Sequence, residues 1–386
     1  MKSARVNILQ IATLFTPEGK FGGPTRVAQD QTKGLIRTNH NVLLAGAGTG
    51  FGSRMPERLE GTPVQLFPSI NIGRRGFAGT VSPGFYWWLW NNCRKFDVVH
   101  VHFARDLITL PAALIVRRRG VPMVLQTHGM VVVHRSMLVR IFDRLVTSRI
   151  LSAADRVLGL TNHEVSELTA ICGNRTIRTR TQPNGVNVAE PIDELLIKDE
   201  VLFVARLHPR KGAILFVEAA KYLIELGHTS IFTLIGPDEG EGKEIASLIS
   251  NFGSDQIRWL GGLKADLVDR HISSSMFVVL PSKKEPFGMT IIEAMSNSKP
   301  VVISDDAEIA SIVEGHGAGI IAERTVMGMA AAMEILIGDK MMRFEMGKRG
   351  HSLVAEEFSL DAVVSNLEND YMSVLALNRS GNVENN

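Results

Sequence analysis

Cysteine and long apolar runs are what this sequence most lacks. The chain has 386 residues and 2 Cys, Cys93 and Cys172. These are too few for a disulfide framework or a zinc site, so a reducing cytoplasm is the default setting. No apolar run approaches the roughly 20 residues that span a bilayer, and Leu107–Val116, among the longest, reaches about half of that. The apolar segment Val6–Phe15 is broken by polar residues and has no cleavage signal, which argues against a secretory leader. We therefore expect a soluble, cytoplasmic protein, which could still sit on a membrane surface.

Net charge is also small, but it is unevenly distributed. The whole chain carries a formal charge of +2. Residues 1–190 contain 24 Lys and Arg against 11 Asp and Glu, whereas residues 191–386 contain 18 against 29. Such an asymmetry indicates an anionic partner for the basic half. The alternative is that the two domains differ in surface charge without a functional reason, since net charge of either sign keeps a domain soluble.

Short β-rich apolar runs alternate with helical patterns along the chain. The runs read as near-continuous Val, Ile and Leu, which is typical of sheets that helices cover on both faces. This alternation predicts an α/β fold with two Rossmann-like, doubly wound parallel sheets. The expected strands are Val6–Leu14, Asn41–Ala45, Val98–Val101, Val121–Gln126, Arg156–Leu160, Val201–Val204, Ile231–Ile235, Ile257–Leu260, Phe277–Leu280 and Val301–Ile303. Expected helices include Thr25–Arg37, Leu107–Arg118, His163–Thr169, Gly212–Leu226, Gly242–Asn251, Lys264–Ser274 and Met289–Asn297.

The best domain boundary is the polar segment Thr181–Glu200. We expect an N-terminal Rossmann-like domain over residues 1–188 and a C-terminal one over residues 189–360. A terminal helix over residues 361–376 would cross back to the first domain, and residues 377–386 would form a flexible tail. Ligands of such sheets bind beyond the carboxyl ends of the strands. Two sheets that face each other would place these ends around a central cleft.

Two glycine-rich segments follow early strands. Gly22 and Gly23 would let the backbone approach a ligand, and the helix after them would aim free N–H groups at an anion. An ordinary turn is the alternative. The second cluster, residues 46–52, does not fit G-x-G-x-x-G, because Phe51 and Ser53 stand where the third glycine would be. A nicotinamide cofactor bound by that motif is therefore excluded.

Two cations stand at a strand end in the second half of the chain. The strand Val201–Val204 runs directly into Arg206, and Lys211 precedes the next helix. Cations pushed into a cleft cost free energy unless an anion meets them. A guanidinium forks onto two oxygens and an ammonium acts as a point charge, which is a pairing suited to a diphosphate. The alternative is that Arg206 and Lys211 are ordinary surface charges, which lie on a loop and contact only water.

Two carboxylates flank the start of a later helix. Glu285 lies in the loop after Phe277–Leu280, and Glu293 lies in the helix that Gly288–Thr290 opens. Glu285 could accept hydrogen bonds from sugar hydroxyls, the amides could meet a phosphate, and Glu293 could bind a ribose. Their spacing also fits the acid and base of a glycoside hydrolase. The cations Arg206 and Lys211 count against that, since hydrolysis of a plain glycoside needs no diphosphate clamp.

The run from Glu285 to Glu293, E-P-F-G-M-T-I-I-E, resembles the E-x7-E signature of retaining GT-B glycosyltransferases, specifically glycosyltransferase family 4. Nearly all of residues 6–376 agrees with that family, and six motifs in register are specific although each alone is modest. The other segments, in order, are Gly22-Gly23, Asp97–His102, Thr127-His128-Gly129, Pro183–Val186, and Val204–Arg206 with Lys211-Gly212.

The resemblance implies a retaining, metal-independent hexosyltransferase that uses a UDP- or GDP-sugar. The acceptor would be a glycan or a lipid-linked molecule in cell-surface polysaccharide or glycolipid synthesis. The nucleotide diphosphate sugar is a co-substrate, so no cofactor is expected, and no nucleic acid partner. Within the fold, a sugar-nucleotide epimerase or a phosphorylase is the alternative, although no lysine can be placed for the pyridoxal phosphate of the latter. The alternative outside the enzymes is a protein that binds a nucleotide sugar without catalysing its transfer.

The resemblance also implies residue roles. Arg206 and Lys211 would neutralise the donor diphosphate. Glu285 would hold hydroxyls of the donor sugar and Glu293 the ribose. His128 would contact the donor sugar near the reacting carbon, so His128 and Glu285 are the expected catalytic residues. The other expected donor-binding residues are Gly22, Gly23, Gly236, Leu263, Phe287, Gly288, Met289 and Thr290.

An aromatic segment in the basic half suggests where the acceptor is met. Trp87, Trp88 and Trp90 are three of the 4 Trp of the chain. Trp side chains next to Lys or Arg are typical of proteins that bind at a membrane interface. Each basic residue near an anionic membrane surface contributes about 1 kcal/mol to the binding free energy. We expect this half to visit the inner face of the plasma membrane as a peripheral protein. A helix whose aromatics pack into the core is the alternative. The flanking basic residues are Arg74, Arg75, Arg94 and Lys95.

Overall fold

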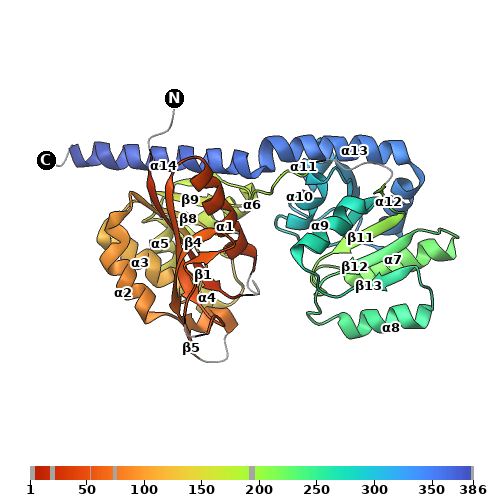
Figure 1. Ribbon diagram of the computed structural model, residues 1–386, viewed down its shortest axis with the longest axis horizontal. Coiled ribbons are helices and arrows are strands. Elements are labelled where there is room, and N and C mark those ends of the chain that lie inside the picture. The colour runs from red at the N-terminus through yellow and green to blue at the C-terminus, as the bar shows by residue number, and fades with distance from the viewer. Residues whose placement is uncertain (1–4, 18–21, 53, 73–75, 191–195, 384–386) are drawn as a thin grey trace. The chain divides into compact units, whose positions relative to one another are not determined.

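The fold is seen in a computed structural model that describes residues 5–17, 22–52, 54–72, 76–190 and 196–383. The chain divides into two compact units, one of residues 1–185 with 360–386 and one of residues 186–359. Each unit contains one large, mainly parallel sheet with helices on both faces (Figure 1). The predicted fold class, α/β with two Rossmann-like units, is confirmed.

The sheet of the first unit has the strand order β10-β9-β8-β7-β1-β2-β4-β3, and only β3 pairs antiparallel. Every residue of β1 except Asn7 is buried, because crossover helices cover both faces of a parallel sheet. The strands are β1 Asn7–Phe15, β2 Asn41–Gly48, β3 Arg58–Leu59, β4 Thr62–Pro68, β7 Val98–His102, β8 Met123–Gln126, β9 Arg156–Gly159 and β10 Thr179–Thr181. The strands β5 Ile70–Asn71 and β6 Thr80–Val81 form a separate ribbon.

Helices cover this sheet from two sides. On one face, Phe85 and Leu89 of α2 join Val116 of α3 in a buried core with Val99 and Val101 of β7. On the other face lie α1 and the last helix of the chain, α14. The helices are α1 Gly22–Arg37, α2 Pro83–Asn92, α3 Thr109–Arg119, α4 Met137–Phe142, α5 Ser148–Leu151, α6 Asn162–Cys172 and α14 Leu360–Val383.

The helix α14 belongs to the first unit although it comes last in the chain. Its residues Val363, Leu367 and Tyr371 are buried against strands of the first sheet. Gly34 of α1 makes room for this packing, since a Cβ there would lie 2.4 Å from Cγ2 of Val364. An apolar stripe along α14 thus closes the second face of the sheet.

The second unit has a six-stranded sheet in the order β13-β12-β11-β14-β15-β16, and all its paired strands run parallel. Because the strands are parallel, their carboxyl ends lie at one edge of the sheet and their amino ends at the other. The strands are β11 Glu200–Val204, β12 Ile231–Ile235, β13 Ile257–Trp259, β14 Phe277–Leu280, β15 Val301–Ser304 and β16 Gly319–Ala322. The helices are α7 Ala213–Glu225, α8 Gly242–Phe252, α9 Ala265–Ser274, α10 Met289–Ser296, α11 Ala310–Gly315, α12 Val326–Gly338 and α13 Lys340–Leu353.

The structure differs from the expectations at three places. The predicted loop at Gly22-Gly23 is the first turn of α1. The predicted end of the last helix at residue 376 is wrong, since α14 continues to Val383, and residues 384–386 of the predicted tail lie outside the described residues. The strands β3, β4, β5, β6, β10 and β16 were not expected, because five of them have only two to four residues and β4 contains Pro63 and Pro68, which count against a strand.

The early glycine cluster has a structural explanation. Gly46 and Gly48 lie in β2, and a Cβ on Gly46 would approach the carbonyl oxygen of Ala12 in β1 to 2.3 Å. These two glycines therefore permit close strand packing, which agrees with the exclusion of a dinucleotide motif there. Across the described ranges, no helix combines the length and apolar character needed to cross a bilayer.

Candidate functional site

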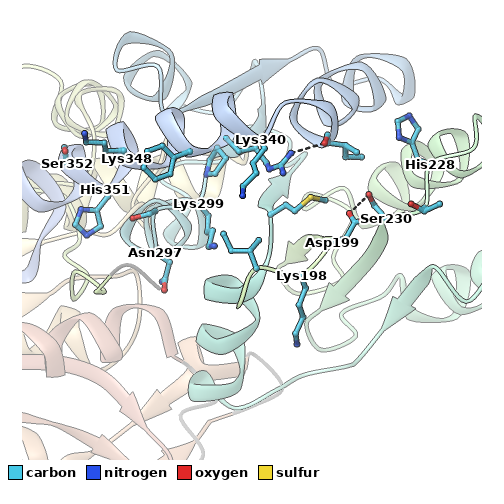
Figure 2. Close-up of a pocket in the computed structure, with 18 of the residues that line it drawn as sticks. Lys198, Asp199, His228, Ser230, Asn297, Lys299, Lys340, Lys348, His351 and Ser352 are labelled. Carbon is cyan, nitrogen blue, oxygen red and sulfur yellow. Dashed lines mark hydrogen bonds between the residues drawn. The ribbon is translucent and has the colours of Figure 1, made fainter. Parts of the chain in front are cut away.

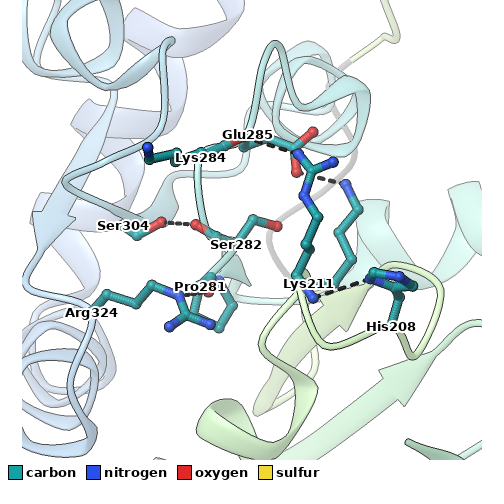
Figure 3. A network of polar contacts seen from close by, with 9 residues as sticks. His208, Lys211, Pro281, Ser282, Lys284, Glu285, Ser304 and Arg324 are labelled. Carbon is teal, nitrogen blue, oxygen red and sulfur yellow. Dashed lines mark hydrogen bonds and ion pairs between the residues drawn. The ribbon is translucent and has the colours of Figure 1, made fainter. Parts of the chain in front are cut away.

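Lys211 and Glu285 are brought together at the carboxyl edge of the second sheet. Lys211 lies between β11 and α7, and Glu285 lies between β14 and α10. The Lys211 Nζ is 2.5 Å from the Glu285 Oε2, and the two side chains are only 23% and 10% exposed (Figure 3). An ion pair shielded from water in this way is much less screened than one on the surface. Two residues that are 74 positions apart in sequence thus form one charged centre.

A glycine allows the two loops to approach each other. Gly212 begins α7 with a positive φ of 74°, and a Cβ there would lie 2.4 Å from the carbonyl oxygen of Pro281 at the end of β14. The loops are also joined by the Lys283 N–H, which donates to the Arg210 carbonyl at 2.7 Å, and by the Arg210 guanidinium, which donates to the Lys284 carbonyl at 3.1 Å. The position of Lys211 is therefore set by backbone contacts as well as by its own ion pair.

Arg206 has a partner that the sequence did not indicate. Its Nη1 donates to both carboxylate oxygens of Glu239 at 2.8 Å. The two side chains are 61% and 37% exposed, so the pair is worth little to stability. Glu239 follows β12, the neighbour of β11 in the sheet. Because this pair is exposed, an anion of higher charge can replace Glu239 on the guanidinium at small cost.

The start of α10 offers backbone donors beside this centre. Its N-cap is Gly288, at φ 72°, and no side chain caps the helix. Free N–H groups in the first turn, at Met289 and Thr290, make such a terminus favourable for an anion. Phe287 is 5% exposed and packs edge-on against Phe358, with ring centroids 5.8 Å apart. The side chain of Phe287 is therefore part of the core, and it anchors the turn.

The remaining second-unit residues of the prediction lie on the same edge. Glu293 is half-buried in the second turn of α10. Gly236, directly after β12, donates its N–H to the Gly261 carbonyl at 2.8 Å, and a Cβ there would lie 1.8 Å from the Ala205 carbonyl oxygen. Leu263 is half-buried in the loop before α9. The loop after β13 is thus joined to the turn at Gly236.

In the first unit, His128 lies in a network of stacked histidines. Its Nε2 is 2.7 Å from the His102 Nδ1, and its Nδ1 is 3.0 Å from the Asn184 Oδ1. The His102 ring stacks on His128 with centroids 5.0 Å apart and on His100 with centroids 4.7 Å apart. The Nδ1 of His100 in turn lies 2.6 Å from the Tyr371 hydroxyl of α14. The network connects the turn after β8 to β7 and to α14.

Burial keeps these rings neutral. It lowers the pKa of His128 to about 4 and that of His100 to about 3, and it lowers the pKa of His102 well below its usual value. The amide oxygen of Asn184 can only accept, so it fixes the proton of neutral His128 on Nδ1. The His128 Nε2 faces the His102 Nδ1, and the other nitrogen of His102 lies 3.0 Å from the Gln10 Oε1. Both ring nitrogens of His128 are thus engaged within its own unit.

Glu164 anchors the turn that carries His128. One carboxylate oxygen accepts from the Thr127 Oγ1 at 2.5 Å and from the Gly129 N–H at 2.7 Å, and the other accepts from the Leu160 N–H at 2.6 Å. Glu164 is 4% exposed. His128 has a φ of 51°, an uncommon conformation for a residue other than glycine. Glu164 therefore holds a strained turn, and a capping-box pattern, Thr161 three residues before Glu164, was the sequence signal for it.

The first-unit glycines of the prediction lie in the first turn of α1. A Cβ on Gly23 would meet nothing within 4 Å, so the space beside this turn is open. Gly22 and Gly23 follow residues 18–21, which lie outside the described residues. The helix α1 is 16 residues long and has no acidic residue in its first turn, so no side chain of that turn neutralises the positive end of its dipole.

Comparison with known proteins gives one family model in each unit. Residues 22–185 match the model described as "Glycosyl transferase 4-like domain", and residues 193–352 match the model described as "Glycosyl transferases group 1". The two matched stretches contain all the residues to which the sequence assigned a role.

Curated relatives share about a quarter of their residues with this chain. Alpha-D-kanosaminyltransferase of Streptomyces kanamyceticus is 26% identical over an alignment of 357 residues that covers 84% of this chain and 91% of that protein. A D-inositol 3-phosphate glycosyltransferase of Gordonia bronchialis is 26% identical over an alignment of 308 residues that covers 72% of this chain and 66% of that protein.

Solved structures show the same fold at lower identity. Anabaena HepE in complex with UDP superposes with a TM-score of 0.76 at 18% identity, over 95% of this chain and 100% of that one. Sucrose-phosphate synthase from Thermosynechococcus elongatus superposes with a TM-score of 0.73 at 17% identity, over 96% of this chain and 100% of that one.

Proposed function

Because the chain is a GT-B glycosyltransferase of the glycosyl transferases group 1 family, we propose that it transfers a sugar from a nucleotide diphosphate sugar with retention of anomeric configuration and without a metal ion. The observation that carries this proposal is the shielded Lys211–Glu285 pair, with Arg206 on the same loop as Lys211. A retaining mechanism is typical of this family, and related folds have been crystallised with UDP and UDP-glucose.

The chemistry of the second-unit site suits a diphosphate leaving group. Lys211 supplies a point charge, Arg206 a forked donor, and the first turn of α10 backbone N–H groups. Negative charge on the phosphate oxygens grows as the bond to the sugar breaks, so preorganised donors stabilise the transition state more than the ground state. Glu285, which contacts Lys211, is proposed to accept from sugar hydroxyls, and Glu293 is proposed to hold the ribose.

Within the first unit we propose His128 as the second catalytic residue. We propose that its neutral ring, held by His102 and Asn184, contacts and positions the donor sugar and is not a source of positive charge. Gly22 and Gly23, at the start of α1, are proposed to face phosphate or acceptor oxygens through their backbone. Gly236, Leu263 and the Phe287–Thr290 backbone are proposed to complete donor binding. Since no side chain among these residues is an evident nucleophile, the leaving phosphate is proposed to take the acceptor proton.

Donor binding tests the proposed function directly. UDP, GDP and ADP are added in turn, and unfolding is followed by heating. We expect one of the three to raise the unfolding temperature, because a ligand at 100 times its Kd stabilises the folded state by about 2.7 kcal/mol. The sugar derivatives of that nucleotide are then offered with glycan and lipid-linked acceptors, and nucleoside diphosphate release is measured. Absence of any nucleotide-dependent shift contradicts the proposal, and binding without turnover on every acceptor favours a nucleotide-sugar-binding protein.

We propose that the acceptor is met at an anionic membrane surface, where cell-surface glycans or glycolipids are made. The predicted aromatic helix is divided between core and surface, since Phe85 and Leu89 are buried while Trp87 is 73% exposed. Arg74 and Arg75, which flank it in sequence, lie outside the described residues.

A second exposed apolar segment supports this proposal more strongly. On α4, Met137 and Leu138 are 73% and 79% exposed, and Arg140 beside them is exposed as well. The segment is held by Arg105, which donates to both carboxylate oxygens of Asp143 at 2.8 Å. Apolar side chains interleaved with arginines on a surface helix are typical of binding to anionic lipid. Further exposed residues of this segment are Val133, Arg135, Ile141, Phe142, Arg144 and Leu145.

Flotation with liposomes tests the membrane proposal. We expect the protein to float with vesicles that contain phosphatidylglycerol and to remain unbound with phosphatidylcholine alone. Leu138→Glu should weaken flotation about tenfold, since burial of one large apolar side chain is worth about 1.5–3 kcal/mol. Leu226→Glu, at an exposed apolar position of the second unit, is the matched control and should float normally. Equal flotation with both kinds of vesicle, or no effect of Leu138→Glu, would overturn the proposal.

A further inference from the structure

A large cavity opens at the amino edge of the second sheet, opposite the edge that carries Lys211 and Glu285. Its volume is about 890 Å³ (Figure 2). Four adjacent strands, β12, β11, β14 and β15, begin at it, since Ser230, Asp199, Met276 and Pro300 each directly precede one of them and line the cavity. Strands of four or five residues at 3.3 Å each separate the two edges by roughly 15 Å. The helices α12 and α13 complete the wall.

The cavity is strongly basic in a unit that is otherwise acidic. Its lining contains Lys198, Lys299, Lys340, Arg343 and Lys348, and Asp199 is the one carboxylate among the lining residues that the structure describes. The residues 186–359 of this unit carry 17 Lys and Arg against 26 Asp and Glu. The five cations of the lining repel one another, and an anionic ligand bound between them would remove that repulsion.

Lys299 is the most informative of these cations. It is only 3% exposed and lines the cavity, yet in the described part of the chain its side chain has no ion pair or hydrogen bond. Burial and the nearby Arg343 lower its pKa to about 8. An ammonium group held inside a protein without a countercharge costs free energy. Such a group is retained where an anion supplies the missing partner.

Arg343 is positioned for the same task. Its Nη1 donates to the carbonyls of Leu336 and Ile337 at the end of α12, the latter at 2.9 Å. These bonds fix the guanidinium at the cavity wall. The apolar wall of the cavity includes Met276, and Phe344 next to Arg343 on α13. Cationic and apolar side chains in one cavity suit a ligand that has both a multiply charged end and a ring or hydrocarbon part.

We propose that this cavity is a second ligand site, separate from the donor site, which binds a small organic phosphate through Lys299, Arg343 and Lys348. The size of the cavity is in the range of small-molecule sites, roughly 300–1,000 Å³. The phosphates would meet the three cations, and the organic part would lie against Phe344.

Calorimetric titration with ATP as the probe tests the proposal. Four proteins are compared: the wild type, Lys299→Met, Lys348→Glu and the donor-site variant Lys211→Ala. We expect ATP to bind the wild type and Lys211→Ala, and to bind Lys299→Met and Lys348→Glu at least tenfold more weakly. Lys243→Glu, an exposed lysine of α8, is the matched control and should bind as the wild type does. Because Lys299→Met removes an uncompensated buried charge, it should also unfold at a higher temperature than the wild type without ligand.

The outcomes separate this site from the proposed donor site. Binding that is lost in Lys211→Ala but unchanged in Lys299→Met and Lys348→Glu overturns the second site while it supports the donor site. Binding that shows the reverse pattern supports the second site whatever the fate of the donor proposal. Adenosine that binds as tightly as ATP would show that the cations take no part, and tripolyphosphate that binds as tightly as ATP would show that the apolar wall takes none. Either result overturns the organic phosphate as the ligand.

Discussion

Replacing Lys211 with alanine is expected to lower kcat/KM for the nucleotide-sugar donor by about 10- to 150-fold. A hydrogen bond to a charged group is worth about 1.5–3 kcal/mol, and each 1.4 kcal/mol is tenfold in rate. The same change leaves the Glu285 carboxylate, 10% exposed, without its countercharge, and that carboxylate then repels the incoming phosphates. We therefore expect the loss to lie toward the upper end of this range.

Because Lys211 and Glu285 are paired, the site assignment can be tested with both single variants and with the double variant. Glu285→Ala should also lose at least about tenfold, because the sugar hydroxyls lose an acceptor that carries charge. Since the two side chains are in contact, the double variant should lose less than the product of the two single losses. Initial rates of nucleoside diphosphate release measure all three. Lys243→Ala, on α8, should stay within about twofold of the wild type, and near wild-type rates in Lys211→Ala or Glu285→Ala would contradict the site assignment.

Glu164→Ala is expected to destabilise the first unit by about 3 kcal/mol or more. The change removes the acceptor of three donors, the Thr127 hydroxyl and the N–H groups of Gly129 and Leu160. Each buried donor left without a partner costs about 1–3 kcal/mol. The turn at His128, which is held at a φ of 51°, should relax as well, so activity should fall by more than the loss of folded protein explains.

Tryptophan fluorescence during urea unfolding measures this effect in the right unit. Trp87, Trp88 and Trp90 lie on α2 of the first unit, whereas Trp259 belongs to the second. Glu164→Gln keeps one acceptor oxygen and should cost about half as much. Glu167→Ala, one turn later on the same helix α6, controls for the change in helix propensity. Glu164→Ala with the stability and rate of the wild type would show that this carboxylate does not anchor the turn.

Local patterns in the sequence were enough for the architecture. Near-continuous apolar runs and helical periodicity predicted two parallel α/β units. A strand that is buried on both sheet faces is apolar along nearly its whole length, so each strand can be recognised by itself. The order of six motifs predicted the family. The strands β4 and β16 were missed, since β4 contains two prolines and β16 has only 4 residues. The end of α14 was misplaced, since polar residues continue a helix as readily as they end it.

The sequence predicted which residues belong to the candidate site, but not which of their side chains come into contact. Lys211 and Glu285 were each assigned to the donor, yet their contact was not foreseen, and neither was the Arg206–Glu239 pair. Glu164 was missed although a capping pattern pointed to its helix start. The two ion pairs, and the contact of Glu164 with Thr127, join segments after neighbouring strands that are 33 to 74 positions apart in sequence. No local pattern reports which of these segments become neighbours.

By itself, then, the sequence determined which strand ends carry charge, which helix begins beside Glu285, and to which family the chain belongs. Only the tertiary structure decided that Lys211 meets Glu285, that burial keeps His128 neutral, and that a basic cavity lies at the amino edge of the second sheet. The physical reason is the order of the strands. In the order β12-β11-β14-β15, crossover connections bring distant segments side by side, so both the charged pair at one edge and the cations at the other exist only once the sheet has formed.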